Sequence, residues 1–517
     1  MRRKLDQGRG RPIISTVFKD HRVVAVGSRV FFSKQWKTFP DFLIYYIKTV
    51  MGGDWGNSEL AKDASVRHPL VNWYQMLCAQ QQATITTPGE IATARPTGAS
   101  WAYLNLAYNL YLLAHNVQVQ SRLIERLKDP EQFYGAYYET FVARHFIEAG
   151  FTLELEDETD GTTTHCEFTA TQTETGKKFS VEAKCRYVGN TDAERKRAKY
   201  RIGRHLFGAL GKRAAYPRIV FIDAGTQNMV DEHTADRWAR AATHGLRRLE
   251  STLLKGAELP PAYVFLTYDS ALENLTSTNL VRAVVAEGFR IADFRRDVGF
   301  PSIRDAVASR ERHAPMHALM KSIGERNWQI PQSFDGKFPE LMNQDEAERL
   351  IVGHVYDVAG DGEPPRMARL VTGTVMPEKK LAWTVMTMLD GSGNAIYTFP
   401  LSDNEIAAYR RQPDTFFGVV QSQGKQAKDG LDMFDFFWEC YSNTPTEKLL
   451  EFLANHPRIA ELRTADRKEI LTTFCEGYAN SAVAMAEKRK AQSPIGGPAK
   501  TVGTGQADDH EAGPTPT

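Results

Sequence analysis

The stretch that decides the fold spans residues 165–186 and reads HCEFTATQTETGKKFSVEAKCR. In its second half, apolar and polar residues alternate strictly, which is typical of a half-buried β-strand. This alternation puts Glu182 and Lys184 side by side on one face of the strand. A glycine-containing turn separates them from a first strand that carries Glu167. If the two strands pair as a hairpin, Glu167 comes close to Glu182, and two carboxylates beside an ammonium suit a divalent cation and a phosphate.

A third acid precedes this stretch in a segment that the sequence predicts to be helical. Residues 131–150 end at Gly150, which is a typical C-terminal stop for a helix. Glu139 lies there among small and apolar neighbours at offsets of three, four and seven, which share one helix face. A carboxylate in such surroundings is costly unless it is paired or bound to a metal, so we expect Glu139 to point inward.

The helix acid, the strand acid and the Glu-X-Lys motif occur in this order along the chain. The predicted secondary-structure elements of the region run helix, strand, strand, strand, helix, strand. With these features, residues 131–300 resemble the PD-(D/E)XK nuclease superfamily, which has the restriction-endonuclease-like fold. The resemblance implies an α/β core with a mixed sheet flanked by helices. It implies Glu139, Glu167 and Glu182 as ligands of Mg²⁺ or Mn²⁺. It also implies a catalytic group of Glu167, Glu182 and Lys184, in which the lysine orients or polarises the attacking water.

The sequence departs from the family pattern at the first motif, where the usual Pro-Asp is Cys166-Glu167. Glutamate can still bind a metal, but its side chain is longer than that of aspartate. Simpler explanations exist for every acid. Glu182 and Lys184 also suit a solvated strand face, Glu139 a structural ion pair, and Glu167 a surface position. Glu-X-Lys alone is too short to decide, so the hypothesis depends on the coincidence of all the acids.

The charge of the chain changes sign along this region, although the formal net charge of the whole chain is only +1. Residues 131–176 contain ten Asp or Glu and one Arg, whereas residues 184–218 contain eleven Lys or Arg and two acids. The acidic block suits a cation site. The basic block follows the motif strand, is predicted to be helical, and suits either a phosphate backbone or a solvated helix face. The residues expected to bind nucleic acid are Arg186, Arg195, Lys196, Lys199 and Arg204.

Periodicity and turn signals divide the chain of 517 residues into several predicted regions. These are an N-terminal α+β region (1–130), the nuclease-like core (131–300), a helical connection (301–335), a small antiparallel β domain (336–430), a C-terminal helical segment (431–490) and a disordered tail (491–517). Within the core, a helix near residues 278–287 is expected to end at Gly288. The tail is predicted to be disordered because it is rich in Gly, Pro and Thr.

The composition is ordinary for a globular protein, with 42% hydrophobic and 25% charged residues. The five cysteines are scattered and form no Cys-x-x-Cys pattern, which favours a reducing compartment and argues against a zinc site. The longest apolar run, residues 101–114, is shorter than the ~20 residues that a membrane-spanning helix needs. We therefore expect a cytoplasmic protein that does not bind membranes.

From the resemblance and the charge pattern we expect a metal-dependent nuclease that hydrolyses phosphodiester bonds, with DNA as the favoured substrate. The alternative is a catalytically inactive nuclease-like fold that binds nucleic acid or protein. A third possibility is a multidomain interaction protein that does not bind nucleic acid. The sequence also leaves open whether the chain has a protein partner or forms a homo-oligomer. Convergence of the Glu167 and Glu182 carboxyl groups would favour the enzyme, and outward splaying would favour the binding module.

Overall fold

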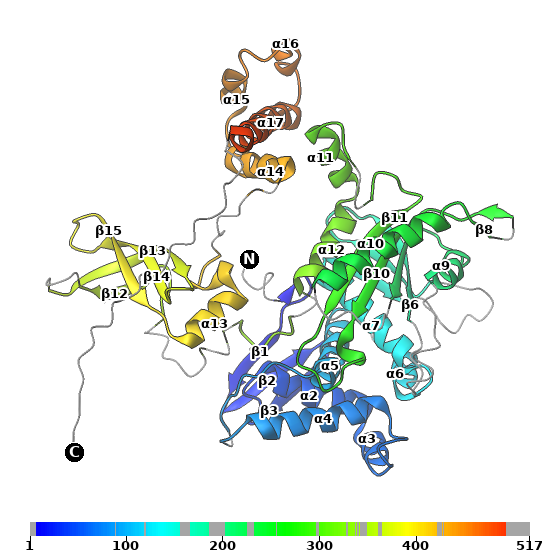
Figure 1. Ribbon diagram of the computed structural model, residues 1–517. Helices are drawn as coiled ribbons and strands as arrows, with labels where there is room; N and C mark the ends of the chain where they lie inside the picture. The colour runs from blue at the N-terminus through cyan, green and yellow to red at the C-terminus, as the bar shows by residue number, and fades with distance from the viewer. Residues whose placement is uncertain are drawn as a thin grey trace, which may run out of the picture. The chain divides into compact units, whose positions relative to one another are not determined.

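The computed structural model describes most of the chain (Figure 1). The described residues are 7–87, 89–117, 120–155, 166–185, 202–224, 232–254, 256–295, 299–326, 329–336, 338, 341, 349–359, 364–420, 427 and 429–492. The chain forms two compact units. Unit 1 comprises Met1–Val298 and Arg312–Gly424, and unit 2 comprises Gly299–Glu311 and Lys425–Thr517.

Unit 1 contains a six-stranded sheet with the strand order β11-β10-β7-β6-β5-β4 (Figure 1). Its strands are β4 (Phe151–Leu155), β5 (Phe168–Gln172), β6 (Lys178–Lys184), β7 (Arg218–Asp223), β10 (Ala262–Asp269) and β11 (Arg282–Phe289). Strands β4, β5 and β6 form an antiparallel meander. Strand β7 runs parallel to both β6 and β10, and β11 pairs antiparallel with β10. The sheet is therefore mixed, as the sequence predicted.

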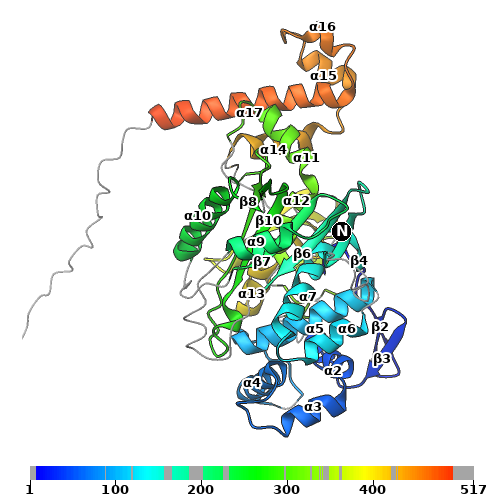
Figure 2. The same ribbon diagram turned by 90° about the vertical axis from the view of Figure 1, so that its right-hand side faces the viewer.

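Helices cover both faces of this sheet (Figure 2). The helices concerned are α7 (Phe133–Glu148), α9 (Ile202–Leu210), α10 (Glu232–Leu249) and α12 (Ala314–Arg326). Alternate side chains of β7 show the two layers. Ile219 and Phe221 lie in one core with α7 and α12, whereas Val220 and Ile222 lie in a second core with α9 and α10. From α7 to β7, the described elements follow the order helix, strand, strand, strand, helix, strand.

The prediction of a helix near residues 278–287 is wrong, because most of this segment belongs to β11 (Arg282–Phe289). Strand β11 pairs with the otherwise unpaired edge of β10 over the full length of both strands, from Ala262 opposite Phe289 to Asp269 opposite Arg282. Its β-branched valines suit a strand, and the pairing outweighs the local helical pattern. Gly288 does not end a helix. It is needed because a Cβ at this position would collide with the backbone oxygens of Ile291 and Phe294.

The N-terminal part of unit 1 packs directly on α7. Its elements are β1 (Ile14–Phe18), β2 (His21–Val26), β3 (Arg29–Ser33), α2 (Phe39–Met51), α3 (Gly53–Leu60), α4 (Pro69–Thr84), α5 (Gly98–Asn116) and α6 (Ser121–Lys128). The apolar run at residues 101–114 lies in α5, and most of the side chains of this helix are buried. Across the α5–α7 interface, Asn105 Nδ2 donates to Tyr137 Oη at 3.1 Å and Arg144 Nη1 donates to Asn105 Oδ1 at 2.6 Å. No helix in the described ranges combines the length and apolar character needed to cross a membrane.

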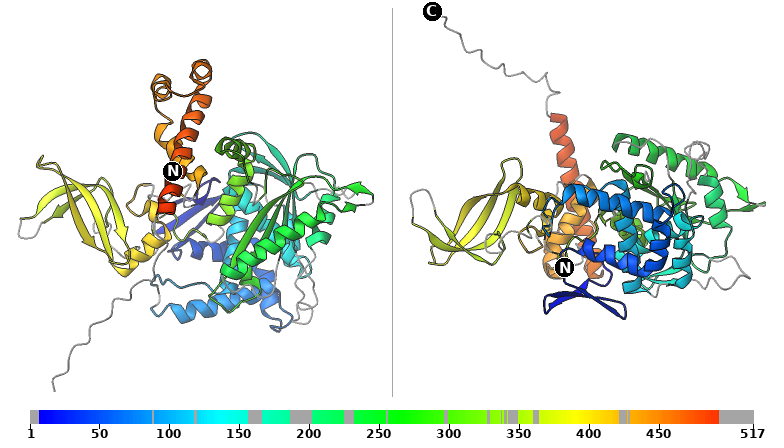
Figure 3. Two further views of the ribbon diagram at one scale, coloured as in Figure 1. Left: turned by 45° about the horizontal axis from the view of Figure 1, so that its top comes forward. Right: turned by 90° about the horizontal axis from the view of Figure 1, so that it is seen from below.

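Besides a short hairpin of β8 (Leu253–Leu254) and β9 (Ala257–Glu258), the other elements form a small antiparallel sheet and a set of helices toward the C-terminus. The sheet has the order β12-β13-β14-β15, as predicted for an antiparallel β domain, and Figure 3 shows its strands in yellow. The elements are β12 (Val355–Val358), β13 (Arg366–Met376), β14 (Leu381–Met388), β15 (Asn394–Pro400), α13 (Asp403–Arg411), α14 (Gly430–Tyr441), α15 (Thr446–Phe452), α16 (Ile459–Leu462) and α17 (Arg467–Gln492). The predicted disordered tail lies outside the described residues, except for its first two positions in α17.

The predicted helical connection is divided between the two units. Helix α11 (Ile303–Arg312) packs in unit 2, where Val307 shares a core with Phe434 of α14 and Phe474 of α17. Arg304 strengthens this packing through ion pairs with Glu469 at 2.7 Å and Glu476 at 3.1 Å. Helix α12 instead packs on the six-stranded sheet of unit 1.

Candidate functional site

The pairing of β5 with β6 places the two motif acids beside one another. The strands are antiparallel, with Phe168 opposite Val181. Just before β5, the backbone N–H of Glu167 donates to Val181 O at 2.9 Å, so the pairing extends to Glu167. Glu182 follows Val181 directly on β6. The predicted hairpin is therefore confirmed, and its register brings Glu167 to the level of Glu182.

Two ammonium groups lie against these two carboxylates. Lys212 Nζ is 2.7 Å from Glu182 Oε1 and 3.6 Å from Glu167 Oε1. Lys184 Nζ forms an ion pair with the same oxygen of Glu182 and lies 3.9 Å from Glu167 Oε1. Because both carboxylates contact both ammonium groups, their side chains converge on one site, and the formal charges of the four groups cancel.

Glu182 is the most buried member of the cluster, with 1% of its surface exposed. Burial and the nearby Glu167 carboxylate raise the pKa of Glu182, whereas Lys184 and Lys212 oppose the rise. Its Oε1 atom contacts both ammonium groups. Its Oε2 atom is buried and has no hydrogen-bond partner within the described part of the chain. A buried carboxylate oxygen in this state suits a cation ligand, because an unsatisfied anionic atom is costly in the interior.

Lys212 joins the site from the turn that follows α9. The buried face of α9 packs on the sheet through residues such as Leu206 and Leu210, and the helix ends just before Lys212. Arg218 Nη2 donates to Lys212 O at 3.1 Å, which ties this turn to the start of β7. Burial alone would lower the pKa of Lys212, but the Glu182 and Glu167 carboxylates outweigh it and raise the pKa.

Lys212 belongs to the basic block of residues 184–218, and its place in the site was not among the predicted contacts. The sequence nevertheless contains a signal for it. Lys212 lies in the basic block that is predicted to be helical and shortly before the apolar run at residues 218–223 (RIVFID), which is typical of a buried strand. In a helix–strand connection of this kind, such a residue lies near an end of the sheet. The sequence therefore predicts that Lys212 lies near an end of the sheet, but it does not predict which residue Lys212 contacts.

Glu139 approaches the same end of β6 from the other face of the sheet. It lies on α7, where it forms a two-pronged ion pair with Arg126 at 2.8 and 2.5 Å. Burial, Asp223 and Glu139 together raise the pKa of the Cys185 thiol, which follows Lys184 and packs on the α7 side. The geometry thus gives Glu139 a structural ion pair, which the sequence analysis left open as an alternative to a metal ligand.

The predicted nucleic-acid-binding residues are described in part. Arg204 is exposed on α9. Arg186, Arg195, Lys196 and Lys199 lie outside the described residues. The charge of the basic block is therefore known from the sequence, whereas the structure shows the position of Arg204 alone among these five.

The residues that could hold a metal ion are Glu167 and Glu182. The described ranges contain no group of three or more His, Cys, Asp or Glu side chains arranged for a metal. Mg²⁺ does not need such a group, since proteins often bind it through one or two carboxylates and leave water in the other positions. The free Glu182 Oε2 atom and the neighbouring Glu167 carboxylate fit this mode of binding.

The nearby thiol does not offer nucleophilic chemistry. Burial, together with the Glu182 carboxylate, raises the pKa of Cys166 to about 11. Because the thiolate is the reactive form, Cys166 is inert at neutral pH. The site therefore provides carboxylates and ammonium groups, which suit a hard cation and a phosphate.

Comparison of the chain with protein-family models, curated proteins and solved structures gives no match.

Proposed function

We propose that the chain is a metal-dependent nuclease of the PD-(D/E)XK type that hydrolyses phosphodiester bonds in DNA. The observation that carries the proposal is the convergence of Glu167 and Glu182, from adjacent positions of a hairpin, on the ammonium groups of Lys184 and Lys212. The order of elements from α7 to β7 supports it, because the restriction-endonuclease-like core has the same order.

Glu167 and Glu182 would hold Mg²⁺ or Mn²⁺ at this site. When bound, the cation would supply Lewis-acid polarisation of a phosphate oxygen and of an attacking water. The Oε2 atom of Glu182, which has no hydrogen-bond partner among the described residues, would be available to bind the cation. A cation beside Glu182 repels the two ammonium groups, so Lys184 and Lys212 would turn from the carboxylate toward an incoming phosphate.

The two lysines would then act on the substrate. Lys184 is the residue that the family resemblance assigns to orienting the attacking water. Lys212 is placed beside it and would contact a non-bridging phosphate oxygen, where negative charge develops in the transition state. Preorganised positive groups in a site shielded from water are effective at stabilising such charge. Arg204 and the rest of the basic block would bind the backbone of the substrate.

Glu182→Gln tests this proposal, because it keeps the shape of the side chain and removes its charge. Wild-type protein should cleave plasmid, linear or single-stranded DNA with Mg²⁺ or Mn²⁺, and a chelator should stop the reaction. Glu182→Gln should lose both cleavage and the calorimetric signal of Mn²⁺ binding. Glu174→Gln is the matched control, since Glu174 is an exposed acid in the turn between β5 and β6. Unchanged cleavage and metal binding in Glu182→Gln would refute the assignment of this site.

A second candidate function is a nuclease-like fold that binds nucleic acid without cleaving it. The observation that favours it is the balance of two carboxylates against two ammonium groups, which leaves the site neutral without any added cation. This candidate predicts no cleavage of DNA or RNA with Mg²⁺ or Mn²⁺, together with DNA affinity that falls steeply with added salt. The same set of substrates and metals therefore separates the two candidates.

A further inference from the structure

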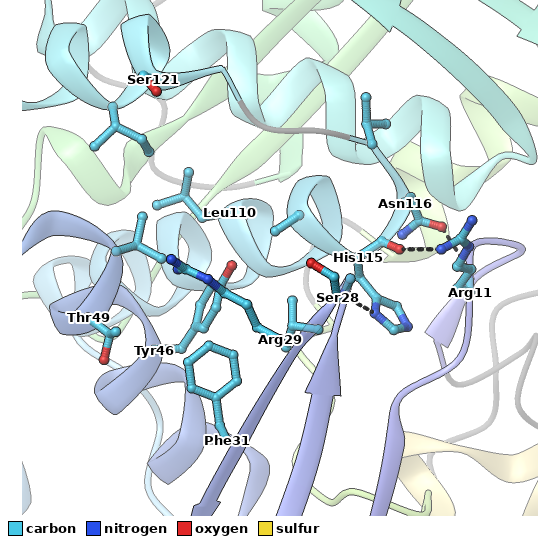
Figure 4. Close-up of a pocket in the computed structure, with 16 residues that line it drawn as sticks. Arg11, Ser28, Arg29, Phe31, Tyr46, Thr49, Leu110, His115, Asn116 and Ser121 are labelled. Carbon is cyan, nitrogen blue, oxygen red and sulfur yellow. Dashed lines mark hydrogen bonds between the residues drawn. The ribbon is translucent and has the colours of Figure 1, made fainter.

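A cavity lies in the N-terminal part of unit 1, on elements other than β5 and β6. It has a volume of about 980 Å³ and lies between the β2–β3 turn, α2, α5 and the start of α6 (Figure 4). All of its lining residues belong to the described part of the chain, and none of them is Asp or Glu. Two of them, Arg11 and Arg29, carry a positive charge. The cavity is therefore cationic, which selects for an anionic ligand.

The β2–β3 turn forms one wall because a glycine allows it to approach α5 closely. Gly27 has φ +57°, and a Cβ at this position would lie 2.8 Å from Ala114 O. The Gly27 N–H also lies 3.4 Å from His115 Nδ1 as a hydrogen-bond donor. Arg11 fixes the neighbouring wall, because its Nη1 donates to His115 O at 3.3 Å. These contacts hold the mouth of the cavity in a defined shape.

Tyr46 supplies a buried polar group that faces the cavity. Its side chain lies on α2 and is only 4% exposed, and Figure 4 shows its hydroxyl directed into the hollow. No residue in the described ranges accepts or donates a hydrogen bond to this hydroxyl. Burial raises the pKa of Tyr46 to about 12, while the charge of Arg29 opposes the rise. The hydroxyl therefore stays protonated at neutral pH and is available as a donor. A hydroxyl that lines the cavity in this state can donate a hydrogen bond to a ligand oxygen.

Arg29 lies in the cavity beside Tyr46 (Figure 4). In the described part of the chain, its guanidinium group makes no hydrogen bond or ion pair. The planar guanidinium offers a fork of N–H donors that matches phosphate and carboxylate oxygens. His115 adds no charge at neutral pH, because burial lowers its pKa. Arg29 and Tyr46 are thus the free donors around which an anion could be held.

The rest of the lining combines polar side chains such as Ser28 and Thr49 with apolar ones, and it is too extensive for a simple anion. Phe31, Val50, Leu110 and Ile124 contribute an aromatic ring and aliphatic groups. A volume of about 980 Å³ is at the upper end of what cofactor-sized and drug-sized ligands occupy. A free phosphate ion would leave most of this space unfilled. A ligand that combines a phosphate with a flat, weakly polar ring matches both parts of the lining.

We propose that this cavity binds a nucleoside phosphate, with its phosphate on Arg29 and the Tyr46 hydroxyl and its base against Phe31 and the aliphatic wall. The inference goes beyond the proposed nuclease activity, because none of these residues belongs to the Glu167–Glu182 cluster. Calorimetry on the full chain is the test, with AMP and UMP as purine and pyrimidine probes and with adenosine and inorganic phosphate for comparison. At least one nucleotide should bind with a stoichiometry of one, and adenosine and inorganic phosphate should each bind at least tenfold more weakly.

The variants locate the ligand. Arg29→Ala should weaken nucleotide binding by roughly tenfold or more, because it removes a charge-assisted contact. Tyr46→Phe should weaken it by roughly fivefold, which is the size expected for one neutral hydrogen bond. Lys34→Ala is the matched control, since Lys34 is exposed and outside the lining, and it should bind like the wild type. Glu182→Gln should also bind like the wild type, which separates this cavity from the nuclease site.

Several results would overturn the proposal. These are the absence of binding by either nucleotide at millimolar concentration, inorganic phosphate binding as tightly as AMP and UMP, or nucleotide affinity that is lost in Glu182→Gln. Unchanged affinity in both Arg29→Ala and Tyr46→Phe would also overturn it. Thermal unfolding of each variant checks that it folds. Arg29 is exposed, so Arg29→Ala keeps the test decisive even if Tyr46→Phe disturbs the core.

Discussion

Lys212 Nζ and Glu182 Oε1 form a partly buried ion pair of 2.7 Å that links the turn after α9 to strand β6. Lys184 contacts the same oxygen, and Glu167 Oε1 lies 3.9 Å from Lys184 Nζ and 3.6 Å from Lys212 Nζ, so two carboxylates share two cations. Under the proposed function, an incoming phosphate would draw one of the two cations away from Glu182.

Lys212→Ala should therefore separate cleavage from metal binding. Removing one cation from Glu182 lowers the competition for its carboxylate, so the affinity for Mn²⁺ should rise. Cleavage should nevertheless fall by about 10²-fold, the loss typical of one preorganised group. Calorimetry and single-turnover cleavage measure the two effects. Arg213→Ala, which removes the exposed neighbouring charge, is the control and should leave both nearly unchanged. Wild-type cleavage by Lys212→Ala would exclude a role for this residue in the reaction.

Lys184→Ala should abolish most cleavage while leaving the fold and most DNA affinity intact. Its ammonium group lies beside Glu182, where charge would develop in the proposed reaction, and loss of such a group costs about 10²–10³-fold in rate. Lys196→Ala should have the opposite effect, with weaker binding at high salt and normal turnover at saturation. Lys196 belongs to the part of the basic block that lies outside the described residues, and each phosphate contact contributes a small share of the affinity. Single-turnover rates and salt-dependent binding of both variants test this contrast.

Glu139→Gln should affect stability more than metal binding. The ion pair with Arg126 is partly buried, so its loss should cost about 1–3 kcal/mol in the free energy of unfolding. Affinity for Mn²⁺ should change by less than about twofold, because a group across the sheet contributes little through a screened interaction. Urea unfolding and calorimetry measure the two quantities. A large loss of metal affinity at unchanged stability would instead identify Glu139 as a third ligand.

Gly98→Ala should destabilise unit 1, because Gly98 begins α5 in close contact with another segment. A Cβ there would collide with the backbone oxygens of Asn274 and Ala271, which cannot move as a side chain can. We expect a loss of about 2–3 kcal/mol or more, as for an overpacked core. Gly208→Ala on α9 is the opposite case, since open space surrounds its Cβ position. It should stabilise the protein by about 0.5–1 kcal/mol through helix propensity. Chemical unfolding of both variants gives the comparison, and equal effects would contradict it.

His68 should make the stability of the protein depend on pH. Burial lowers the pKa of His68 from 6.5 to about 4, and its Nδ1 accepts a hydrogen bond from the backbone N–H of Leu70 at 3.2 Å. Since the folded state binds this proton less readily than the unfolded state, the stabilising contribution is complete above pH 6.5 and is lost as the pH falls toward 4. The slope for one such group reaches about 1.4 kcal/mol per pH unit.

His68→Asn isolates this contribution, because asparagine keeps an acceptor near the same position and does not titrate. The stability difference between wild type and variant should shrink as the pH falls from 6.5 to 4. Urea unfolding at several pH values in this range measures the difference. A constant difference would show that His68 does not titrate with a lowered pKa.

The hairpin of the candidate site could be predicted because its signal is local. Alternation fixes which side chains share a face of β6, and a short turn leaves few ways to pair β5 with it. The position of Glu167 beside Glu182 follows from these two facts. Lys212 could not be assigned in the same way, because its contact with Glu182 depends on how α9 packs on the sheet, which no local pattern specifies.

The misassigned helix at residues 278–287 has the same physical origin. Its sequence allows either secondary structure, and the unpaired edge of β10 decides between them. The sequence did not decide between an ion pair and a metal ligand for Glu139 for a related reason, because its partner Arg126 lies on a different helix. In these cases, the sequence limits the alternatives and tertiary contacts select one of them.

The division of unit 2 into two separate chain segments has a consequence for biosynthesis. Helix α11 leaves the ribosome long before α14 and α17, which supply most of its apolar contacts. At translation rates of about 5–20 residues per second, Val307 and its neighbours wait for several seconds without their final partners. During that interval α11 is open to chaperones and to wrong contacts, whereas the sheet and its α12 cover can already be complete. The nascent chain therefore finishes its candidate nuclease region before it can finish the helical unit that α11 begins.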